Sequence, residues 1–278
     1  GNQQLFLDRD GIAISYDNLS NIGGLTITVG ANGTGTAVSG IGGLVNDTFT
    51  FAHYFTGSGD ADVMTSNVDT NGGQGWTPLA GDDSIAGGDG HDRLIYDHDH
   101  EEGGTAGVTV NLANGTATDG FGDTDTFSGI ESVRGTRHND TLTGDGGHNN
   151  FEGEEGDDVI DGGGGNDDYA HYDGAFGDYT VTANADGSVT VADNSGEFGT
   201  DTLRNIEFLS FDESDDVSLA ALAAGATEGN DTLDFSASPN GVDINALAGD
   251  DVLTGSAFDD DLRGDAGNDT ITGGGGRD

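Results

Sequence analysis

A nine-residue period runs through much of this 278-residue chain and constrains its fold more than any other feature. The regular unit reads Gly-Gly-x-Gly-x-Asp-x-U-x, where U is a large apolar residue, as in Gly-Asp-Ala-Gly-Asn-Asp-Thr-Ile-Thr at 264–272. Twelve copies can be placed, beginning at Gly57, Pro78, Gly87, Gly135, Gly144, Gly153, Gly162, Ala226, Ala246, Gly255, Gly264 and Gly273.

The sixth and eighth positions are the most uniform. The eighth position is apolar or aromatic from Met64 to Ile271, and the fourth is Gly except at Asp60, His138 and Phe258. The sixth position holds Asp62, Asp83, Asp92, Asp140, Asn149, Asp158, Asp167, Asp231, Asp251, Asp260, Asp269 and Asp278.

This pattern predicts an all-β coil. The Gly-rich first six positions favour turns, and the last three favour a short strand with one side chain pointing inward. Two units then form one turn of the coil, so that loops n and n+2 lie about 4.8 Å apart. We expect two parallel sheets with an apolar ladder between them, and stacked sixth-position carboxylates along the edges.

Such a stack needs a cation. The chain has 52 acidic and 7 basic residues, a formal net charge of −45. Two charges about 5 Å apart repel by roughly 3 kcal/mol at an effective dielectric of about 20. Several such pairs compete with a typical domain stability of about 5–15 kcal/mol. Carboxylate and carbonyl oxygens at flexible distances suit Ca²⁺ better than Mg²⁺.

The copies resemble the calcium-binding nonapeptides of the RTX (repeats-in-toxin, haemolysin-type) family, most closely at 153–161 and 264–272. The resemblance implies parallel β-roll blocks that bind several Ca²⁺ ions through sixth-position side chains and loop carbonyls. The residues it implicates are Asp83, Asp92, Asp140, Asn149, Asp158, Asp167, Asp231, Asp251, Asp260, Asp269, Asp278, Gly144, Gly153, Gly162, Gly255, Gly264 and Gly273.

Composition argues against several other functions. The acidic surface disfavours nucleic acid and anionic lipid, and the lack of Lys excludes a P-loop. The absence of Cys excludes thiolate catalysis and Cys-based zinc sites. No apolar run approaches 18 residues, so we expect no membrane insertion, and no signal peptide is recognised. No motif pairs a nucleophile with an orienting group, so we expect no catalytic residues.

Antiparallel segments are expected between the repeats. Residues 24–37 and 107–117 each read as an alternating strand and an Asn-Gly turn, and Asp-Thr-Phe follows at 47–49 and 125–127. Asp-Thr-Leu recurs at 201–203. Residues 176–211 contain a hairpin signal, and 217–224 is the only helix-like stretch. These last two segments are predicted to cap and space the rolls.

The resulting domain prediction has four parts. Residues 1–106 form a first degenerate module with repeats at 57–65 and 78–95, and 107–175 form a second with a β-roll at 135–170. Residues 176–224 form a hairpin spacer, and 225–278 a third β-roll module. Because the chain stops inside a repeat, at Asp278, we expect a fragment of a longer protein without the usual export signal.

Three local features have alternative interpretations. The cluster Asp97-His98-Asp99-His100-Glu101-Glu102 is either a zinc or additional Ca²⁺ site or, more simply, a solvated acidic loop. Trp76 is either a sugar-binding platform or, more simply, a cover for the end of the core. Asp8-Arg9-Asp10-Gly11 lacks the Glu that an EF-hand requires and is interpreted as a turn.

The resemblance implies a bacterial protein exported by a type I system that folds on Ca²⁺ binding, at the cell surface or after secretion. The array favours a non-catalytic segment of a large adhesin, surface-layer or matrix protein. The alternative is an appendage of a secreted enzyme such as a protease, lipase or alginate epimerase. Since open sheet edges accept further strands, Ca²⁺-dependent self-association or surface contact is also expected.

Overall fold

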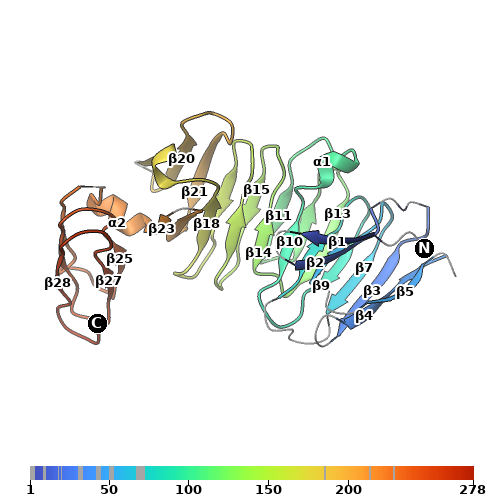
Figure 1. The fold of residues 1–278 in the computed structure, drawn as a ribbon, viewed down its shortest axis with the longest axis horizontal. Coiled ribbons are helices and arrows are strands. Elements are labelled where there is room, and N and C mark those ends of the chain that lie inside the picture. The colour runs from blue at the N-terminus through green and yellow to red at the C-terminus, as the bar shows by residue number, and fades with distance from the viewer. Residues whose placement is uncertain are drawn as a thin grey trace. The chain divides into compact units, whose positions relative to one another are not determined.

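The computed structural model describes the chain apart from residues 1–3, 9–10, 18, 20, 31–33, 42–44, 50–52, 67–72, 185, 213 and 228. Almost all of its regular structure is β-strand, as Figure 1 shows. The chain divides into two compact units: unit 1 comprises Gly1–Asp168 and Asp178–Asn205, and unit 2 comprises Tyr169–Gly177 and Ile206–Asp278. Within the described part of the chain, no helix is long and apolar enough to cross a membrane.

Unit 1 contains two sheets, and the first is parallel apart from its opening hairpin. β1 and β2 pair antiparallel up to Asp8 and Gly11; the rest of the turn predicted there lies outside the described residues. In spatial order the strands are β1 Gln4–Asp8, β2 Gly11–Ser15, β6 Tyr54–Thr56, β8 Gly75–Thr77, β10 Arg93–Ile95, β14 Ser132–Arg134 and β16 Asn150–Glu152.

The second sheet of unit 1 combines repeat strands with longer antiparallel ones. In spatial order its strands are β19 Tyr179–Ala183, β20 Val189–Asp193, β21 Thr200–Arg204, β17 Val159–Asp161, β15 Thr141–Thr143, β11 Thr109–Asn111, β12 Thr116–Thr118, β13 Thr124–Ser128, β9 Ser84–Ala86, β7 Val63–Ser66, β3 Leu25–Gly30, β4 Thr34–Ser39 and β5 Asn46–Phe49.

The predicted parallel β-roll is confirmed by the strand register. Leu142 of β15 is paired with Ile160 of β17, and Val133 of β14 with Phe151 of β16. Each pair is separated by 18 residues, two nonapeptides, as one coil turn requires. The loops between these strands therefore stack along the two edges of the roll.

Within the described residues, three antiparallel segments of the second sheet have the same form. β3–β4–β5, β11–β12–β13 and β19–β20–β21 are three-stranded meanders. The hairpin predicted within 176–211 is confirmed by β19 and β20, where Val181 faces Val191. β11–β12–β13 lies inside the sheet, since β13 pairs with β9 and β11 with β15. The capping role suggested for 176–224 stays a prediction.

The apolar ladder fills the interior. Trp76 lies in register between Phe55 and Leu94, is fully buried and stacks on Phe55 at 5.1 Å between ring centroids. It is therefore a buried core residue, but it lies within the ladder and not at the end of the core where the simpler interpretation placed it. On the opposite sheet the ladder includes Met64 and Ile85, paired in register and both buried.

One repeat differs from the predicted register. In the copy that begins at Gly162, Ala170 is buried at 1% exposure while Tyr169 is only half-buried. Asn149 N–H donates to Asp168 Oδ1 at 2.8 Å, over 19 residues rather than 18. This copy thus has one extra residue after its fourth position. Asp168, not Asp167, occupies the sixth-position place.

Unit 2 contains shorter sheets and one helix. β18 Tyr169–Tyr172, β22 Phe208–Phe211 and β23 Ser214–Ser218 pair in that order. The helix-like stretch is confirmed as α2 Leu219–Ala224, where the Ser218 hydroxyl oxygen accepts from Ala221 N–H. The repeat strands are β24 Thr232–Asp234, β26 Val252–Thr254 and β28 Thr270–Thr272 in one sheet, with β25 Asp243–Asn245 and β27 Asp261–Arg263 in another.

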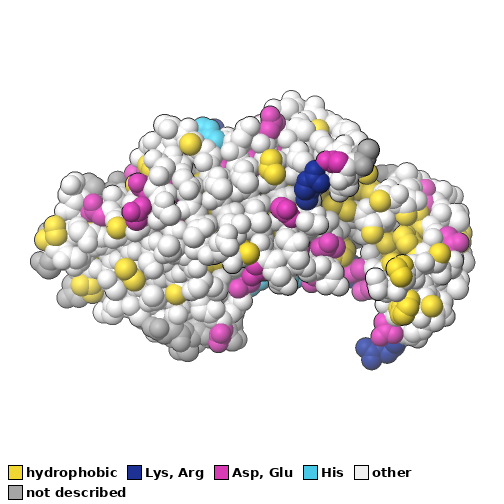
Figure 2. All heavy atoms as spheres, turned by 180° about the vertical axis from the view of Figure 1, so that it is seen from behind, with side chains coloured by type: hydrophobic (Ala, Val, Ile, Leu, Met, Phe, Trp, Pro, Cys, Tyr) yellow, Lys and Arg dark blue, Asp and Glu magenta, His cyan; other side chains and the backbone are white. Residues whose placement is uncertain are grey.

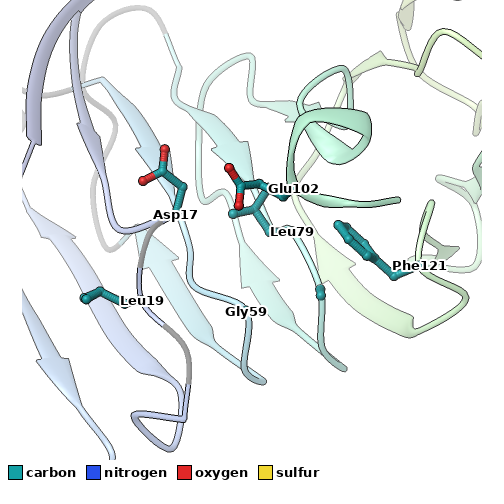
Figure 3. A pocket seen from close by; sticks show the side chains of 7 residues that line it. Asp17, Leu19, Gly59, Leu79, Glu102 and Phe121 are labelled. Carbon is teal, nitrogen blue, oxygen red and sulfur yellow. The ribbon is translucent and has the colours of Figure 1, made fainter. Parts of the chain in front are cut away.

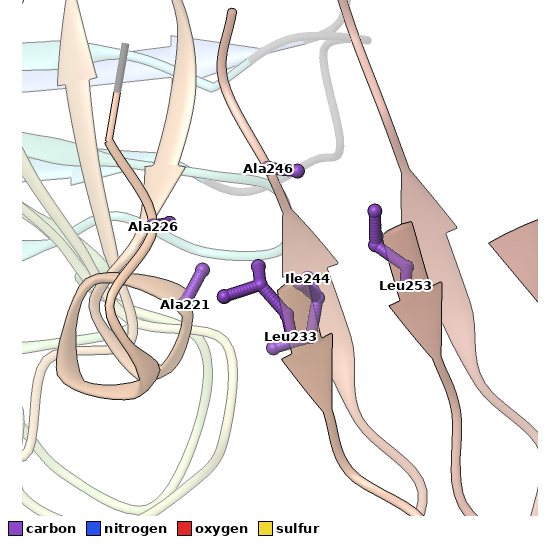
Figure 4. Packing of buried hydrophobic residues seen from close by; sticks show 6 residues of the cluster. All are labelled: Ala221, Ala226, Leu233, Ile244, Ala246 and Leu253. Atoms are coloured by element: carbon purple, nitrogen blue, oxygen red, sulfur yellow. The ribbon is translucent and has the colours of Figure 1, made fainter. Parts of the chain in front are cut away.

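A small apolar cluster holds α2 against the repeat strands of unit 2 (Figure 4). Its buried members are Ala221, Ala226, Leu233, Ile244, Ala246 and Leu253. At the end of the stack Ile271 of β28 is 46% exposed. The eighth-position residue of β26, Leu253, lies between β24 and β28 and is fully buried.

Candidate metal-binding loops

The sixth-position side chains form a hydrogen-bonded ladder along the loop edges. Among the described residues, six of them, with Asp168 in the place of Asp167, accept a hydrogen bond from the main-chain N–H of the sixth-position residue one coil turn earlier. Asp140 N–H donates to Asp158 Oδ1 at 2.8 Å, and Asp62 N–H donates to Asp83 Oδ1 at 2.6 Å. In unit 2 the corresponding acceptors are Asp251, Asp269 and Asp278. The predicted stacking of carboxylates is therefore present in both units.

Three residues outside the repeats continue this ladder and were missed by the sequence reasoning. Asp125 accepts from Asp83 N–H, Asp201 from Asp158 N–H and Glu131 from Asp92 N–H, at 2.9–3.1 Å. The recurring Asp-Thr-Phe/Leu at 125 and 201 was a usable signal, because these aspartates begin the closing strands of two meanders. Nothing in the period marks Glu131.

The first-position glycines are required by the same geometry. A Cβ on Gly153 would lie within 3.0 Å of Asp158 Oδ2, a distance that real side chains do not adopt. The others implicated by the sequence are equally crowded by a side-chain or main-chain oxygen, namely Gly144, Gly162, Gly255, Gly264 and Gly273. These glycines leave room for oxygen atoms that converge on the loop.

Burial makes some of the stacked carboxylates of unit 1 poor anions. It raises the pKa of Asp83 to about 10 and that of Asp158 to about 9. Neighbouring carboxylates reinforce the shift, Asp125 acting on Asp83 and Asp201 on Asp158. Burial raises the pKa of Asp92 less, to about 6. Without a cation, Asp83 and Asp158 favour the protonated form near neutral pH.

Several of these carboxylates also keep an oxygen without a hydrogen-bond partner. Oδ2 is buried and unpaired in Asp83, Asp92, Asp158 and Asp251. A buried anionic oxygen without a partner is costly, so each marks a place for a cation. Among the described residues no three His, Asp or Glu side chains form a metal-binding group. An ion in these loops therefore needs main-chain carbonyls too, a hard-oxygen set that fits Ca²⁺.

Asp167 does not belong to this arrangement. Its carboxylate is exposed and lies 2.9 Å from His148 Nδ1. The slipped register gives its predicted place to Asp168, which is 1% exposed. The metal roles of the other implicated residues stay predictions.

The acidic segment at 97–102 is not simply a solvated loop. It contains the short helix α1 Asp99–Glu102, in which Asp99 is buried and accepts from Gly120 N–H at 3.0 Å. Burial raises the pKa of Asp99 to about 8. Asp97 lies 3.5 Å from both Arg134 and His98. The simpler interpretation is thus wrong for Asp99.

A pocket of about 360 Å³ lies nearby in unit 1 (Figure 3). Asp17 and Glu102 present carboxylates to it, and Leu79 and Phe121 supply apolar walls. Within the described part of the chain its lining contains no hydroxyl, imidazole or basic side chain. Its charge therefore favours cations over anions.

Comparison with known proteins identifies the repeat. The model of the RTX calcium-binding nonapeptide repeat matches in four copies, over residues 79–97, 133–169 and 245–278. These segments contain all four buried unpaired carboxylates described above. No curated protein matches the chain.

Among solved structures, the extracellular lipase LipA from Serratia marcescens is similar at 22% identity, with a TM-score of 0.20. The match covers 54% of this chain and 27% of that one. The chain thus spans well under half the length of that protein. At this TM-score the likeness says nothing about function.

Proposed function

Because this chain carries RTX calcium-binding nonapeptide repeats, we propose that it is a non-catalytic segment of a larger bacterial protein and folds when it binds calcium. RTX repeats bind calcium ions and typify extracellular bacterial proteins exported by type I systems. The matched repeats cover only part of the chain, so the role of the remainder belongs to this proposal.

The observation that carries the proposal is the set of buried, unpaired Oδ2 atoms on Asp83, Asp92, Asp158 and Asp251. Each lies in a stack where the next carboxylate is one coil turn away. A divalent ion converts this repulsion into ligation, and an ion that binds only the folded state adds stability by mass action. Low calcium then favours the unfolded chain, and higher calcium outside the cell favours the fold.

For the parent protein we favour a large adhesin, surface-layer or matrix protein. The support is the tandem character of the array, in which meanders of one form recur at 25–49, 109–128 and 179–204. A second candidate is an appendage of a secreted enzyme such as a protease, lipase or alginate epimerase. The sequence upstream of Gly1 separates them, because the first predicts further repeats and the second a catalytic domain.

Charge sets the conditions for contact with partners. In Figure 2 Asp and Glu side chains are scattered over the visible face, and few basic groups interrupt them. With 52 acidic and 7 basic residues, chains repel one another until ions bind. Contact with a second chain, a cell surface or a matrix therefore belongs to the calcium-loaded state.

Circular dichroism during a calcium titration tests the proposal. In EDTA the chain should show little β-sheet signal, and millimolar Ca²⁺ should restore it cooperatively. Equal concentrations of Mg²⁺ serve as the control and should restore much less, because Mg²⁺ demands stricter octahedral geometry. A β-sheet spectrum that survives complete chelation would contradict the proposal.

A further inference from the structure

The twelve repeats adopt two loop conformations that differ at the second and fourth positions. In seven, here called open loops, both positions have positive φ. At the second position φ is 68° for Leu79, 70° for Glu154 and 71° for Leu247. Residues other than Gly rarely adopt this backbone conformation. The open loops begin at Pro78, Gly87, Gly153, Gly162, Ala246, Gly264 and Gly273.

The other five, here called capped loops, have no positive φ at either position, and the structure describes both positions in each. Their second residue is polar and short. The capped loops have Ser58, Thr136, Asp145, Thr227 and Ser256 at that position. The three exceptions to Gly at the fourth position, Asp60, His138 and Phe258, all lie in capped loops.

A capped loop satisfies its own sixth-position carboxylate. Thr136 N–H donates to Asp140 Oδ2 at 2.6 Å, and the Thr136 hydroxyl donates to Oδ1 at 2.9 Å. The same hydroxyl oxygen accepts from His138 N–H at 3.0 Å, which fixes its orientation. Equivalent bonds join Ser58 to Asp62, Thr227 to Asp231 and Ser256 to Asp260.

The fifth capped loop shows that a negative charge at the sixth position is dispensable there. Asn149 is the one sixth-position residue that is not Asp. Its Oδ1 accepts from Asp145 N–H at 2.9 Å, while Asp145 Oδ1 accepts from Gly147 N–H at 2.7 Å. The position thus works with a neutral amide when the loop supplies the hydrogen bond.

Four of the seven open loops leave their carboxylate with one oxygen unpaired. The four sixth-position residues with a buried unpaired Oδ2, Asp83, Asp92, Asp158 and Asp251, all lie in open loops. Within the described residues, no capped loop has such an oxygen. The other sixth-position residues of open loops are Asp168, Asp269 and Asp278.

The two classes have a fixed order in the stack. Every capped loop is followed one coil turn later by an open loop, and its sixth N–H donates to the open loop's carboxylate. The carboxylates of the capped residues Asp62, Asp140 and Asp260 also accept a main-chain hydrogen bond from the turn below. The N–H groups that donate it belong to no repeat; they are those of Leu25, Val108 and Val242. These three capped loops therefore begin a stack, with no repeat loop below them to share an ion. The capped loop of Asn149 instead follows Glu131, and the open loop of Asp92 accepts from Gln74 N–H, which belongs to no repeat.

We propose that the seven open loops bind calcium through their sixth-position carboxylates and that the five capped loops are metal-independent. In a capped loop the second-position N–H, with the Ser or Thr hydroxyl in four of the five, takes the place of the ion. This inference rests on the proposed calcium-binding function and narrows its ligand set. It assigns ions to Asp83, Asp92, Asp158, Asp168, Asp251, Asp269 and Asp278, and none to Asp62, Asp140, Asn149, Asp231 and Asp260.

Calcium counting on the full chain by native mass spectrometry, checked by equilibrium dialysis, tests the assignment. Asp158→Asn should lose one ion relative to the wild type, whereas Asp140→Asn should keep the full number. These substitutions are matched, since both remove one charge from directly stacked loops. Loss of an ion from Asp140→Asn, or an unchanged count in Asp158→Asn, would overturn the assignment.

A second pair of variants keeps the test valid if Asp158→Asn fails to fold. Glu154→Thr supplies the hydroxyl that a capped loop uses, so it should lose one ion while retaining the β-sheet spectrum. Glu155→Thr makes the same chemical change one residue later and should lose none. Equal ion counts for these two variants would also overturn the inference.

The outcomes separate the two proposals. A wild-type chain that binds no calcium would remove both. A wild type that binds calcium with no difference between open-loop and capped-loop variants would leave calcium-dependent folding intact and remove only the loop assignment.

Discussion

The repeats at 135–161 in unit 1 and those at 246–272 in unit 2 share one sequence pattern but differ in what covers them. In unit 1 the strand β21 continues the stack, so that Leu203 lies in register with Ile160, which is 1% exposed. In unit 2 the sheet ends at β28, and Ile271 is 46% exposed. The same nonapeptide thus has a buried or an exposed apolar residue according to its neighbour.

This difference shows that the energy of a repeat depends on the next turn of the coil. Asp158 has Asp140 on one side and Asp201 on the other, and burial with these charges raises its pKa to about 9. Asp269 has a stacked donor, Asp251, on one side and is only half-buried. We therefore expect perturbations inside the unit 1 stack to cost more than the same changes at the end of unit 2.

The largest contrast should come from the apolar ladder. Leu142→Ala removes a fully buried side chain and should lower the free energy of unfolding in calcium by about 2–5 kcal/mol. Ile271→Ala is expected to cost less than about 1.5 kcal/mol, because nearly half of that side chain is already in water. Urea denaturation at fixed calcium measures both, and similar costs would mean that the end of unit 2 is covered in solution.

The ladder carboxylates give the next contrast. Asp158→Ala leaves Asp140 N–H without its acceptor and removes a candidate ligand, so we expect a loss of roughly 2–3 kcal/mol in calcium. Asp269→Ala should cost less, since solvent can reach Asp251 N–H once the side chain is gone. Asp186→Ala, on the exposed hairpin turn, is the control and should change stability little. A larger loss at Asp269 than at Asp158 would contradict the comparison.

Without calcium the unit 1 stack should depend on pH. Burial raises the folded-state pKa of Asp158 to about 9 and of Asp83 to about 10, above ordinary values near 4. At a pH between the ordinary and the raised pKa values, the folded state binds more protons than the unfolded state. The free energy of unfolding therefore falls as the pH rises. In EDTA, circular dichroism should therefore show a larger residual β-sheet signal at pH 5 than at pH 8.

Calcium provides the control for this effect. When ions occupy the loops they replace the protons, so the advantage of pH 5 should shrink or reverse in millimolar Ca²⁺. A calcium-free β-sheet signal that rises from pH 5 to pH 8 would show that these carboxylates are ionised and satisfied without metal.

The smallest expected effect concerns association at the uncovered end of unit 2. β28 is the last strand of its sheet, and exposed strand edges accept partners. We expect a monomer at low protein concentration and weak, calcium-dependent association at high concentration, measured by light scattering. Association that is equally strong in EDTA and in millimolar Ca²⁺ would contradict this expectation.

Much of the fold follows from the nonapeptide alone. Its length predicts the 18-residue spacing of partners such as Leu142 and Ile160, and its sixth column predicts the stacked carboxylates. Periodicity could not predict the parts that break the period. Asp125, Glu131 and Asp201 join the ladder through strands of unrelated length.

Two other features could not be predicted from the sequence, for physical reasons. In the copy that begins at Gly162, four consecutive glycines at 162–165 define the start of the loop but not the position of the acidic residues after it. The period therefore predicts Asp167 at the sixth position, where the structure has Asp168. Asp99 lies in a charged segment that looks fully solvated, yet its burial comes from Gly120, a tertiary contact that sequence pattern does not encode.

The meanders place successive ladder residues 42 and 43 positions apart, at Asp83–Asp125 and Asp158–Asp201, instead of 18. Closing a loop of 43 residues rather than 18 costs only about 0.8 kcal/mol of extra chain entropy, since the cost grows with the logarithm of length. One carboxylate hydrogen bond of about 1.5–3 kcal/mol offsets that. Insertions of a whole meander between turns are therefore nearly neutral, so such an array can lengthen and diversify without losing its register.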